Sequence, residues 1–199
     1  MVLIMKEIKD RIQEVWQHEQ DILNVFHDVC LKNNLKYSLI FGTLLGAARH
    51  KGFIPWDDDI DVIMPREDYE KLLSIWEKEV PEGYLIQNKR TNDDFTQNFS
   101  KIRKNHTTFI QDEIEKTKKY HTGVFIDIFP ADRVAPRGIR RRMQYVANAV
   151  NLLCAREYSS NTKGVIGFIE KLVLWLPHKM RVGLFLKSER FSIFTIVLY

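Results

Sequence analysis

The chain has 199 residues, of which 45% are hydrophobic, and its 30 basic and 26 acidic side chains give a formal charge of +4. This length and composition exclude a disordered or fibrous protein and predict one globular domain with room for a C-terminal appendage. The two cysteines, Cys30 and Cys154, lie far apart and outside any CxxC motif. We therefore expect reduced thiols in the core and no structural zinc site.

The first half of the chain predicts alternating helices and strands. Its N-terminal apolar run ends after five residues, too short for a secretory signal or a membrane span, so we expect a cytoplasmic protein. Apolar residues at helical spacing over 6–33 predict one long helix or two. A strand is expected at 37–41, a tight turn at Gly42-Thr43 and a helix start at 44–49. A second strand is expected at 59–64, and Pro65 opens a helix that reaches Val80.

The second half predicts more strands and then helices. Strands are expected at 84–87, 99–103, 108–111 and 123–130, with a charged loop over 112–121. A helix over 138–158 carries an apolar face that we expect to pack on the sheet. A linker at 159–164 precedes an apolar segment at 165–177, which is too short and too charged to span a bilayer and predicts an interfacial or core helix. The chain ends in an apolar tail at 191–199.

The segment IPWDDDIDVIM at 54–64 places four carboxylates in five positions directly before an apolar strand. Like charges this close resist burial unless a cation neutralises them or water reaches them. Residues two apart in a strand point to one face about 6.6 Å from each other, so Asp59 and Asp61 can converge on one or two divalent ions. Oxygen ligands favour Mg²⁺ or Mn²⁺. Asp57 and Asp58 are expected to cap or solvate the preceding loop.

Two further features extend this pattern. Asp127 lies among apolar neighbours in a predicted strand and needs a partner to stay charged; a shared metal, a lysine or protonation would each serve. Gly42-Thr43, a turn before a helix start, can present backbone N–H groups and a hydroxyl to a phosphate, although it is also an ordinary turn. Their order along the chain indicates phosphoryl transfer assisted by two metals.

Other acid-rich sites fit less well. An EF-hand counted from Asp57 would need glycine and glutamate where the chain has Val62 and Asp68. A nucleotide-sugar glycosyltransferase also uses a DxD motif, but only after most of a parallel sheet, and one clear strand precedes Asp59 here. A glycosidase pair of carboxylates is not excluded by three acids.

The run FGTLLGAARHKGFIPWDDDIDVIMPREDY at 41–69 closely resembles the signature of the LicD family, phosphocholine transferases of bacterial surface glycans related to the fukutin-type ribitol-phosphate transferases. Residues 99–107 and the segment GVFIDIFPAD at 123–132 are also similar to that family. The likeness covers roughly residues 8–158. Phe41, where a small residue is expected, and the apolar ending, which looks like a shortened C-terminal part, depart from the pattern.

The resemblance implies an α+β fold in which helices flank a nucleotidyltransferase-like mixed sheet, with a catalytic domain at 1–158 and an apolar helical appendage at 159–199. It implies a metal-dependent transferase that moves phosphocholine or a similar phospho-alcohol from CDP-choline or another CDP-linked donor to a surface glycan or its lipid-linked precursor. Gly42 and Thr43 take the phosphate-turn position, Asp59 and Asp61 the metal pair, and Asp127 the third ligand and proton acceptor. The cofactor expected is Mg²⁺ or Mn²⁺.

Other residues carry weaker expectations. Arg49 and Lys101 are candidate phosphate or nucleotide contacts, or plain surface charges, and Trp56 either covers a trimethylammonium group or packs. The arginines of 137–142 are a solvated helix face or a peripheral contact with the inner face of the membrane, and no nucleic-acid partner is expected. Two rival functions stay open. One is a non-catalytic binding module in surface-polysaccharide assembly, and the other is a nucleotidyltransferase that moves NMP to a small molecule.

Overall fold

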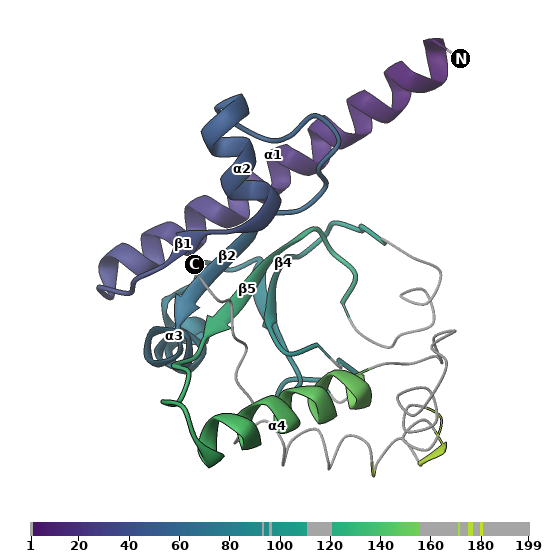
Figure 1. Ribbon diagram of the computed structural model, residues 1–199. Helices are drawn as coiled ribbons and strands as arrows, with labels where there is room; N and C mark the ends of the chain where they lie inside the picture. Colours follow the sequence, from purple (N-terminus) through teal and green to yellow (C-terminus); the bar gives the residue numbers. More distant parts are fainter. Residues whose placement is uncertain are drawn as a thin grey trace. The chain divides into compact units, whose positions relative to one another are not determined.

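The computed structural model describes residues 2–92, 94–95, 97–110 and 121–155, together with 171, 175, 176 and 180. The chain divides into two compact units, one of residues 1–95 and 99–130 and the other of residues 96–98 and 131–199. In chain order the elements (Figure 1) are α1 (Val2–Lys32), β1 (Ser38–Leu39), α2 (Phe41–His50), β2 (Asp61–Pro65), α3 (Arg66–Glu79), β3 (Tyr84–Gln87), β4 (Ser100–Lys104), β5 (Phe125–Ala131) and α4 (Ile139–Ala155).

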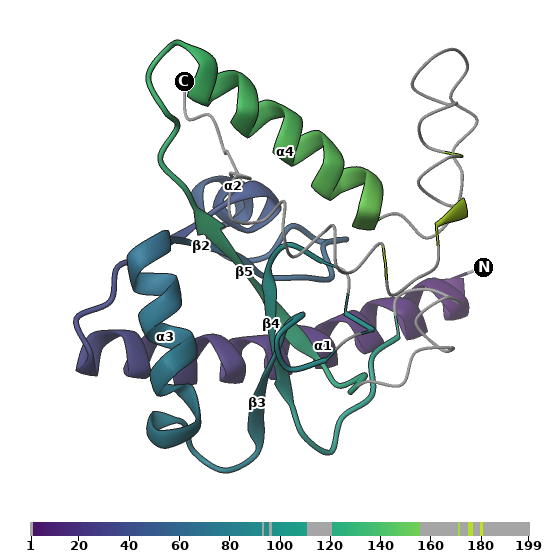
Figure 2. The same ribbon diagram turned by 90° about the horizontal axis from the view of Figure 1, so that it is seen from below.

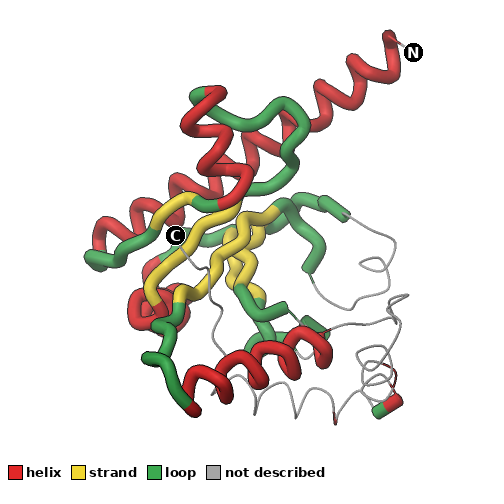
Figure 3. The backbone as a smooth tube through the Cα atoms, viewed as in Figure 1, coloured by secondary structure: helices red, strands yellow, loops and turns green. Residues whose placement is uncertain are grey.

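The five strands form one sheet in the order β1-β2-β5-β4-β3, which Figure 3 shows as a continuous layer. The pairs β1–β2, β3–β4 and β4–β5 are antiparallel, whereas β2 and β5 point the same way in Figure 1. The backbone N–H of Asp127 donates to the carbonyl of Ile60 at 2.8 Å and joins these two central strands. The expected α+β class with a mixed sheet is therefore confirmed.

Helices α1 and α3 bury their apolar stripes against one face of the sheet, and Figure 2 shows both beside the strands. The core cluster takes side chains from both helices and all three central strands: Ile22, Phe26, Val29, Cys30, Leu35, Ile60, Val62, Met64, Tyr69, Leu72, Trp76, Ile102, Val124, Ile126 and Ile128. Side chains alternate along a strand. Asp61 and Asp127, each next to a core residue, therefore point to the opposite face.

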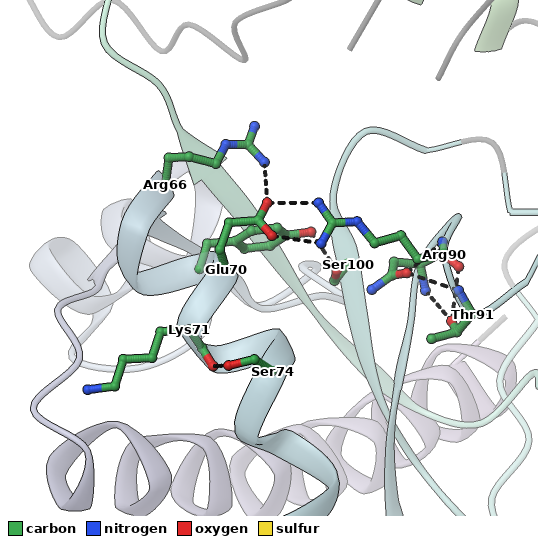
Figure 4. Close-up of polar contacts among 9 residues, drawn as sticks. Arg66, Glu70, Lys71, Ser74, Arg90, Thr91 and Ser100 are labelled. Atoms are coloured by element: carbon green, nitrogen blue, oxygen red, sulfur yellow. Dashed lines mark hydrogen bonds and ion pairs between the residues drawn. The ribbon is translucent and has the colours of Figure 1, made fainter. Parts of the chain in front are cut away.

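Polar contacts fix α3 to the connection between β3 and β4 (Figure 4). The Arg90 guanidinium donates to both carboxylate oxygens of Glu70 at 2.7 and 2.9 Å, and Arg66 lies 3.4 Å from the same carboxylate. Burial raises the pKa of Glu70, but the two arginines outweigh it and lower the pKa overall. The buried hydroxyls of Tyr69 and Ser100 share a hydrogen bond of 2.6 Å. The Tyr69–Ser100 bond joins α3 to β4, and the Arg90–Glu70 pair joins α3 to the connection before it.

The structure confirms one long N-terminal helix and most of the expected strands. The strand expected at 37–41 is shortened to Ser38–Leu39, because α2 already begins at Phe41. No strand forms at 108–110. The backbone leaves the sheet after β4 at His106, whose φ is +59°. Beyond it Phe109 donates a single backbone hydrogen bond, of 2.6 Å, to Thr122. Phe109 packs against the core without pairing in a strand, and its ring lies 6.0 Å from the Phe125 ring.

In the second unit, α4 departs from the expected apolar face. Ile139 is 72% exposed and Val146 is 63% exposed, so these positions are not buried. Arg140 and Arg142 on the same turns are also exposed, whereas Arg141 is half-buried, so both apolar and charged side chains of α4 face solvent. The predicted domain boundary at 158/159, the linker at 159–164 and the tail at 191–199 lie outside the described residues and stay predictions. Within the described residues, no helix is long and apolar enough to cross a membrane.

Candidate active site

The loop between α2 and β2 carries the acidic run and is pinned to α1. The indole N–H of Trp16 donates to the carbonyl of Asp57 at 2.7 Å. The Trp16 ring also stacks on Phe53, with centroids 4.9 Å apart. The Asp57 N–H closes a turn onto the Ile54 carbonyl at 2.9 Å. These contacts fix the backbone that leads into Asp59 and Asp61.

Gly42 and Thr43 were expected in a tight turn before a helix, but they lie in the first turn of α2, which begins at Phe41. This first helical turn lies directly against the acidic run. A Cβ atom at Gly42 would come 2.5 Å from Asp57 Oδ2, so only glycine admits this carboxylate without displacing it. Asp57 Oδ2 is buried and has no hydrogen-bond partner, and burial followed by repulsion from Asp58 raises the Asp57 pKa. The Thr43 hydroxyl accepts a hydrogen bond of 2.8 Å from the Asp61 N–H. The first turn of α2 and the acids, which their order along the chain already grouped, therefore lie side by side.

Asp59 and Asp61 are electrostatically crowded. Burial, then the charges of Asp127, Asp57 and Asp58, raise the Asp59 pKa to about 6, against a smaller lowering by Lys101. Burial, then Asp59 and Asp127, raise the Asp61 pKa to about 7. A carboxylate with such a pKa gains stability from any cation that binds beside it. This is the electrostatic pattern of a cation site.

Asp127 has a lysine as its direct partner. The Lys101 ammonium lies 2.8 and 3.1 Å from the two carboxylate oxygens, and both residues are buried. The β4–β5 register sets Lys101 opposite Asp127, so the pair is built into the sheet. Of the partners that the sequence left open for Asp127, the structure provides the lysine. A metal contact by Asp127 stays a prediction.

Glu19 of α1 is a member of the acidic group that the sequence analysis missed. It is 0% exposed, and neither carboxylate oxygen has a hydrogen-bond partner. Burial, followed by the charges of Asp59, Asp58, Asp57 and Asp127, raises its pKa to about 9. The sequence alone could have indicated that Glu19 is buried, because it lies on the same helix face as the apolar residues Val15, Ile22 and Phe26.

Among the described residues, no three or more His, Cys, Asp or Glu side chains lie together in an arrangement that could hold a metal ion. The donor chemistry nevertheless fits a hard divalent cation. Asp59 and Asp61 supply oxygen ligands, and nearby buried carboxylate oxygens of Glu19 and Asp57 lack partners. The chemistry of these residues therefore fits one ion held by Asp59 and Asp61.

Two sequence-predicted contacts lie apart from this group. Arg49 is exposed near the C-terminal end of α2, seven residues from Gly42, or roughly 10 Å along the helix. The structure therefore does not bring Arg49 to the Gly42 turn. Trp56 is exposed, so the packing alternative for its ring is not observed. Lys101, by contrast, lies within the site.

A cluster of phenylalanine rings adjoins the acids. Phe129, two residues after Asp127 on β5, lies 4.5 Å from Phe99 and 5.6 Å from Phe41, measured between ring centroids. Phe41 is 54% exposed and has a φ of +48°, a conformation that costs a bulky side chain free energy. Phe41 stands where a small residue is expected from the family pattern. In the structure it places an exposed ring, on a strained backbone, beside Gly42.

Comparison with known proteins points to one family, LicD. Residues 34–148 match the family model described as LicD/FKTN/FKRP, nucleotidyltransferase domain. Over 118 residues the chain is 42% identical to the lipopolysaccharide cholinephosphotransferase LicD of Haemophilus influenzae, covering 57% of this chain and 42% of that protein. An uncharacterised protein of Rickettsia prowazekii is 44% identical over 64 residues, which are 32% of this chain and 24% of that protein. The chain thus spans less than half the length of these relatives.

Proposed function

Because the chain belongs to the LicD/FKTN/FKRP family of nucleotidyltransferase domains, we propose that it is a transferase that moves a phospho-alcohol from a CDP-linked donor to a glycan hydroxyl. Phosphocholine is the proposed group, since the Haemophilus relative is named as a lipopolysaccharide cholinephosphotransferase. The observation that carries the proposal is the meeting of Asp59, Asp61 and Asp127 beside Gly42 and Thr43 in the first turn of α2. Such a constellation suits the positioning and charge stabilisation that phosphoryl transfer requires.

Asp59 and Asp61 are the proposed ligands of Mg²⁺ or Mn²⁺. A bound divalent ion would offset the negative charge of the donor phosphates and acidify a nearby hydroxyl. In its absence burial, followed by the charges of neighbouring carboxylates, raises the pKa of both groups. Activity should therefore depend on an added divalent ion and be lost in a chelator.

Asp127 is the proposed acceptor of the proton. The acceptor oxygen forms a bond to the phosphorus of the phosphocholine group, the bond from that phosphorus to the CMP oxygen breaks, and CMP leaves with the bonding electrons. The hydroxyl proton passes to a carboxylate oxygen of Asp127. The Lys101 ammonium, 2.8 Å away, favours the ionised form of this carboxylate and so keeps it ready to accept.

The phenylalanine cluster supports a quaternary ammonium as the transferred head group. Phe41, Phe99 and Phe129 form a connected set of rings next to the acidic group, and the exposed ring of Phe41 leaves a surface for a ligand. Aromatic faces attract trimethylammonium groups, and adjacent carboxylates add to that attraction. Trp56 remains a second candidate for this contact.

A panel of donors tests the proposal. CDP-choline, CDP-ribitol, CTP and ATP would each be incubated with Mg²⁺ or Mn²⁺ and a glycan acceptor, and the nucleotide product identified. We expect CMP from CDP-choline only when the acceptor is present. Release of pyrophosphate from CTP or ATP would instead indicate an NMP transferase. No turnover of any donor, despite donor binding, would indicate a non-catalytic binding module.

A further inference from the structure

The buried lysine of the site points to a metal stoichiometry different from the two-metal arrangement that the sequence indicated. We propose that the Lys101 ammonium takes the place of a second divalent cation, so that the site binds one divalent ion, at Asp59 and Asp61, while Lys101 holds Asp127. The inference rests on the proposed metal-dependent transfer and specifies how its charges are balanced.

The first support is the geometry of the Lys101–Asp127 pair. One ammonium approaches both carboxylate oxygens, at 2.8 and 3.1 Å, so neither oxygen is left without a cationic neighbour. The side chains are only 8% and 9% exposed, which protects the pair from solvent screening. A second divalent ion on Asp127 would have to displace the ammonium or lie against it.

The second support is that the ammonium is held in place. Lys101 Nζ lies 3.3 Å from the centroid of the Phe125 ring, and this ring also carries the Arg103 guanidinium at 4.9 Å. Arg103 is itself fully buried and donates to Gln87 Oε1 at 2.5 Å and to the Gly123 carbonyl at 2.7 Å. Arg103 and Phe125 are thus held in place and restrict the position of the lysine side chain. The cation–π attraction of the Phe125 ring favours the charged form of Lys101.

The third support is the reach of the lysine charge across the acidic group. Lys101 acts on Asp59 and Asp61 as well as on Asp127 and opposes the repulsion among them. It therefore stands where a second cation would balance all three carboxylates. With Asp127 held by the lysine, Asp59 and Asp61 are the proposed ligands that remain for a divalent ion.

Binding of Mn²⁺, followed by electron paramagnetic resonance and by calorimetry, tests the proposal without any measurement of turnover. We expect one Mn²⁺ per wild-type chain and two per Lys101→Met chain, because Asp127 is then released as a ligand. The double variant Lys101→Met/Asp127→Asn should return to one ion. Lys101→Arg, which keeps the charge, should bind one.

Lys104→Met is the matched control, since Lys104 is the other lysine of β4 and pairs with the exposed Asp21 at 2.7 Å. This variant should bind one Mn²⁺, like the wild type. Two ions on the wild-type chain would overturn the inference and leave the proposed function standing if CDP-choline is still turned over. A folded Lys101→Met chain that binds only one ion would also overturn it. Should Lys101→Met fail to fold, the wild-type ratio alone decides.

Discussion

Glu19 shows at the scale of single residues how the site imposes a cost on the fold. A carboxylate with 0% exposure and no hydrogen-bond partner is among the most destabilising groups a core can hold when ionised. Its raised pKa, about 9, indicates that the folded chain keeps this group protonated near neutral pH. The unfolded chain releases the same proton near pH 4.5.

The first prediction is a pH dependence of stability that Glu19→Gln removes. Between about pH 5 and pH 9 the folded chain holds one more proton than the unfolded chain, so the free energy of unfolding falls as the pH rises, by at most about 1.4 kcal/mol per unit. Asp59 and Asp61 add the same sign of slope only up to about pH 6 and 7. Burial raises the pKa of Cys30 from 9.0 to about 12, so this thiol adds the same sign of slope as the pH approaches 9. Urea unfolding in EDTA between about pH 7 and 8 therefore reports mainly on Glu19.

In that range Glu19→Gln should show a flatter profile than the wild type and gain stability relative to it at the higher pH. Asp28→Asn, which removes an exposed carboxylate from the same helix, is the matched control for the loss of one charge from α1. Parallel profiles for Glu19→Gln and wild type would show that Glu19 is ionised in the folded chain. The sequence could not supply this pKa, because it depends first on the burial of Glu19 in the folded chain and then on the charges that the loop at 57–59 brings near α1.

The second prediction concerns the proposed metal pair. Asp59→Asn and Asp61→Asn should each abolish metal-dependent transfer and raise the stability of the metal-free chain by on the order of 1 kcal/mol, because each removes one charge from a crowded group. Donor turnover and thermal unfolding in EDTA check the two parts. Asp58→Asn, from the same acidic run, should keep most of the turnover. Loss of folding in both metal-pair variants would make these acids structural.

At the scale of elements, the acidic run is positioned by the close contact between α2 and the loop that follows it. Gly46 is buried, and a Cβ there would lie 2.5 Å from the carbonyl oxygen of Gly52 and 3.1 Å from the Ile54 nitrogen. Backbone atoms cannot move aside as a flexible side chain can. The close contact of helix and loop thus depends on this glycine, just as the approach of Asp57 depends on Gly42.

The third prediction follows from that contact. Gly46→Ala should push the loop off α2, cost about 1–3 kcal/mol of stability and weaken Mn²⁺ binding, because the loop carries the acids. Gly52→Ala is the control, since a Cβ at Gly52 meets nothing within 4 Å and should leave both quantities nearly unchanged. Chemical denaturation and Mn²⁺ titration provide the measurements. Equal effects of the two substitutions would refute a role for close packing.

The sequence predicted the elements of the first unit well because their apolar periodicity coincides with the faces they bury. α1 and α3 are examples, with stripes that end in the core cluster. It predicted Asp59, Asp61 and Asp127 as a group because each acid interrupts or precedes an apolar strand. It could not give the pairing of Lys101 with Asp127, which follows from the β4–β5 register, a relation between distant segments. The prediction of a strand at 108–110 was wrong, because a segment with high β propensity still needs a neighbouring strand with which to pair.

At the scale of the whole molecule, α4 of the second unit combines two kinds of exposed side chain. Ile139, Met143 and Val146 are apolar and exposed, and arginines lie between the first two of them. Exposed apolar side chains together with arginines are typical of helices that lie in a membrane interface. We therefore expect α4 to bring the chain to the surface where a lipid-linked acceptor would lie, as the proposed function requires.

The last prediction is reversible binding to anionic vesicles. Basic residues near an anionic surface contribute about 1 kcal/mol each, and burial of apolar side chains adds to this, so neither alone would hold the chain but both together would. In sedimentation with phosphatidylglycerol vesicles, binding should weaken with salt and fall when Arg140, Arg141 and Arg142 are changed to Ser. A variant with Lys36, Lys51 and Lys78 changed to Ser removes three exposed charges from the first unit and should bind like the wild type. A chain that stays in the supernatant at low salt, or two triple variants that lose binding equally, would show that α4 is no membrane contact and that its exposed side chains serve another purpose.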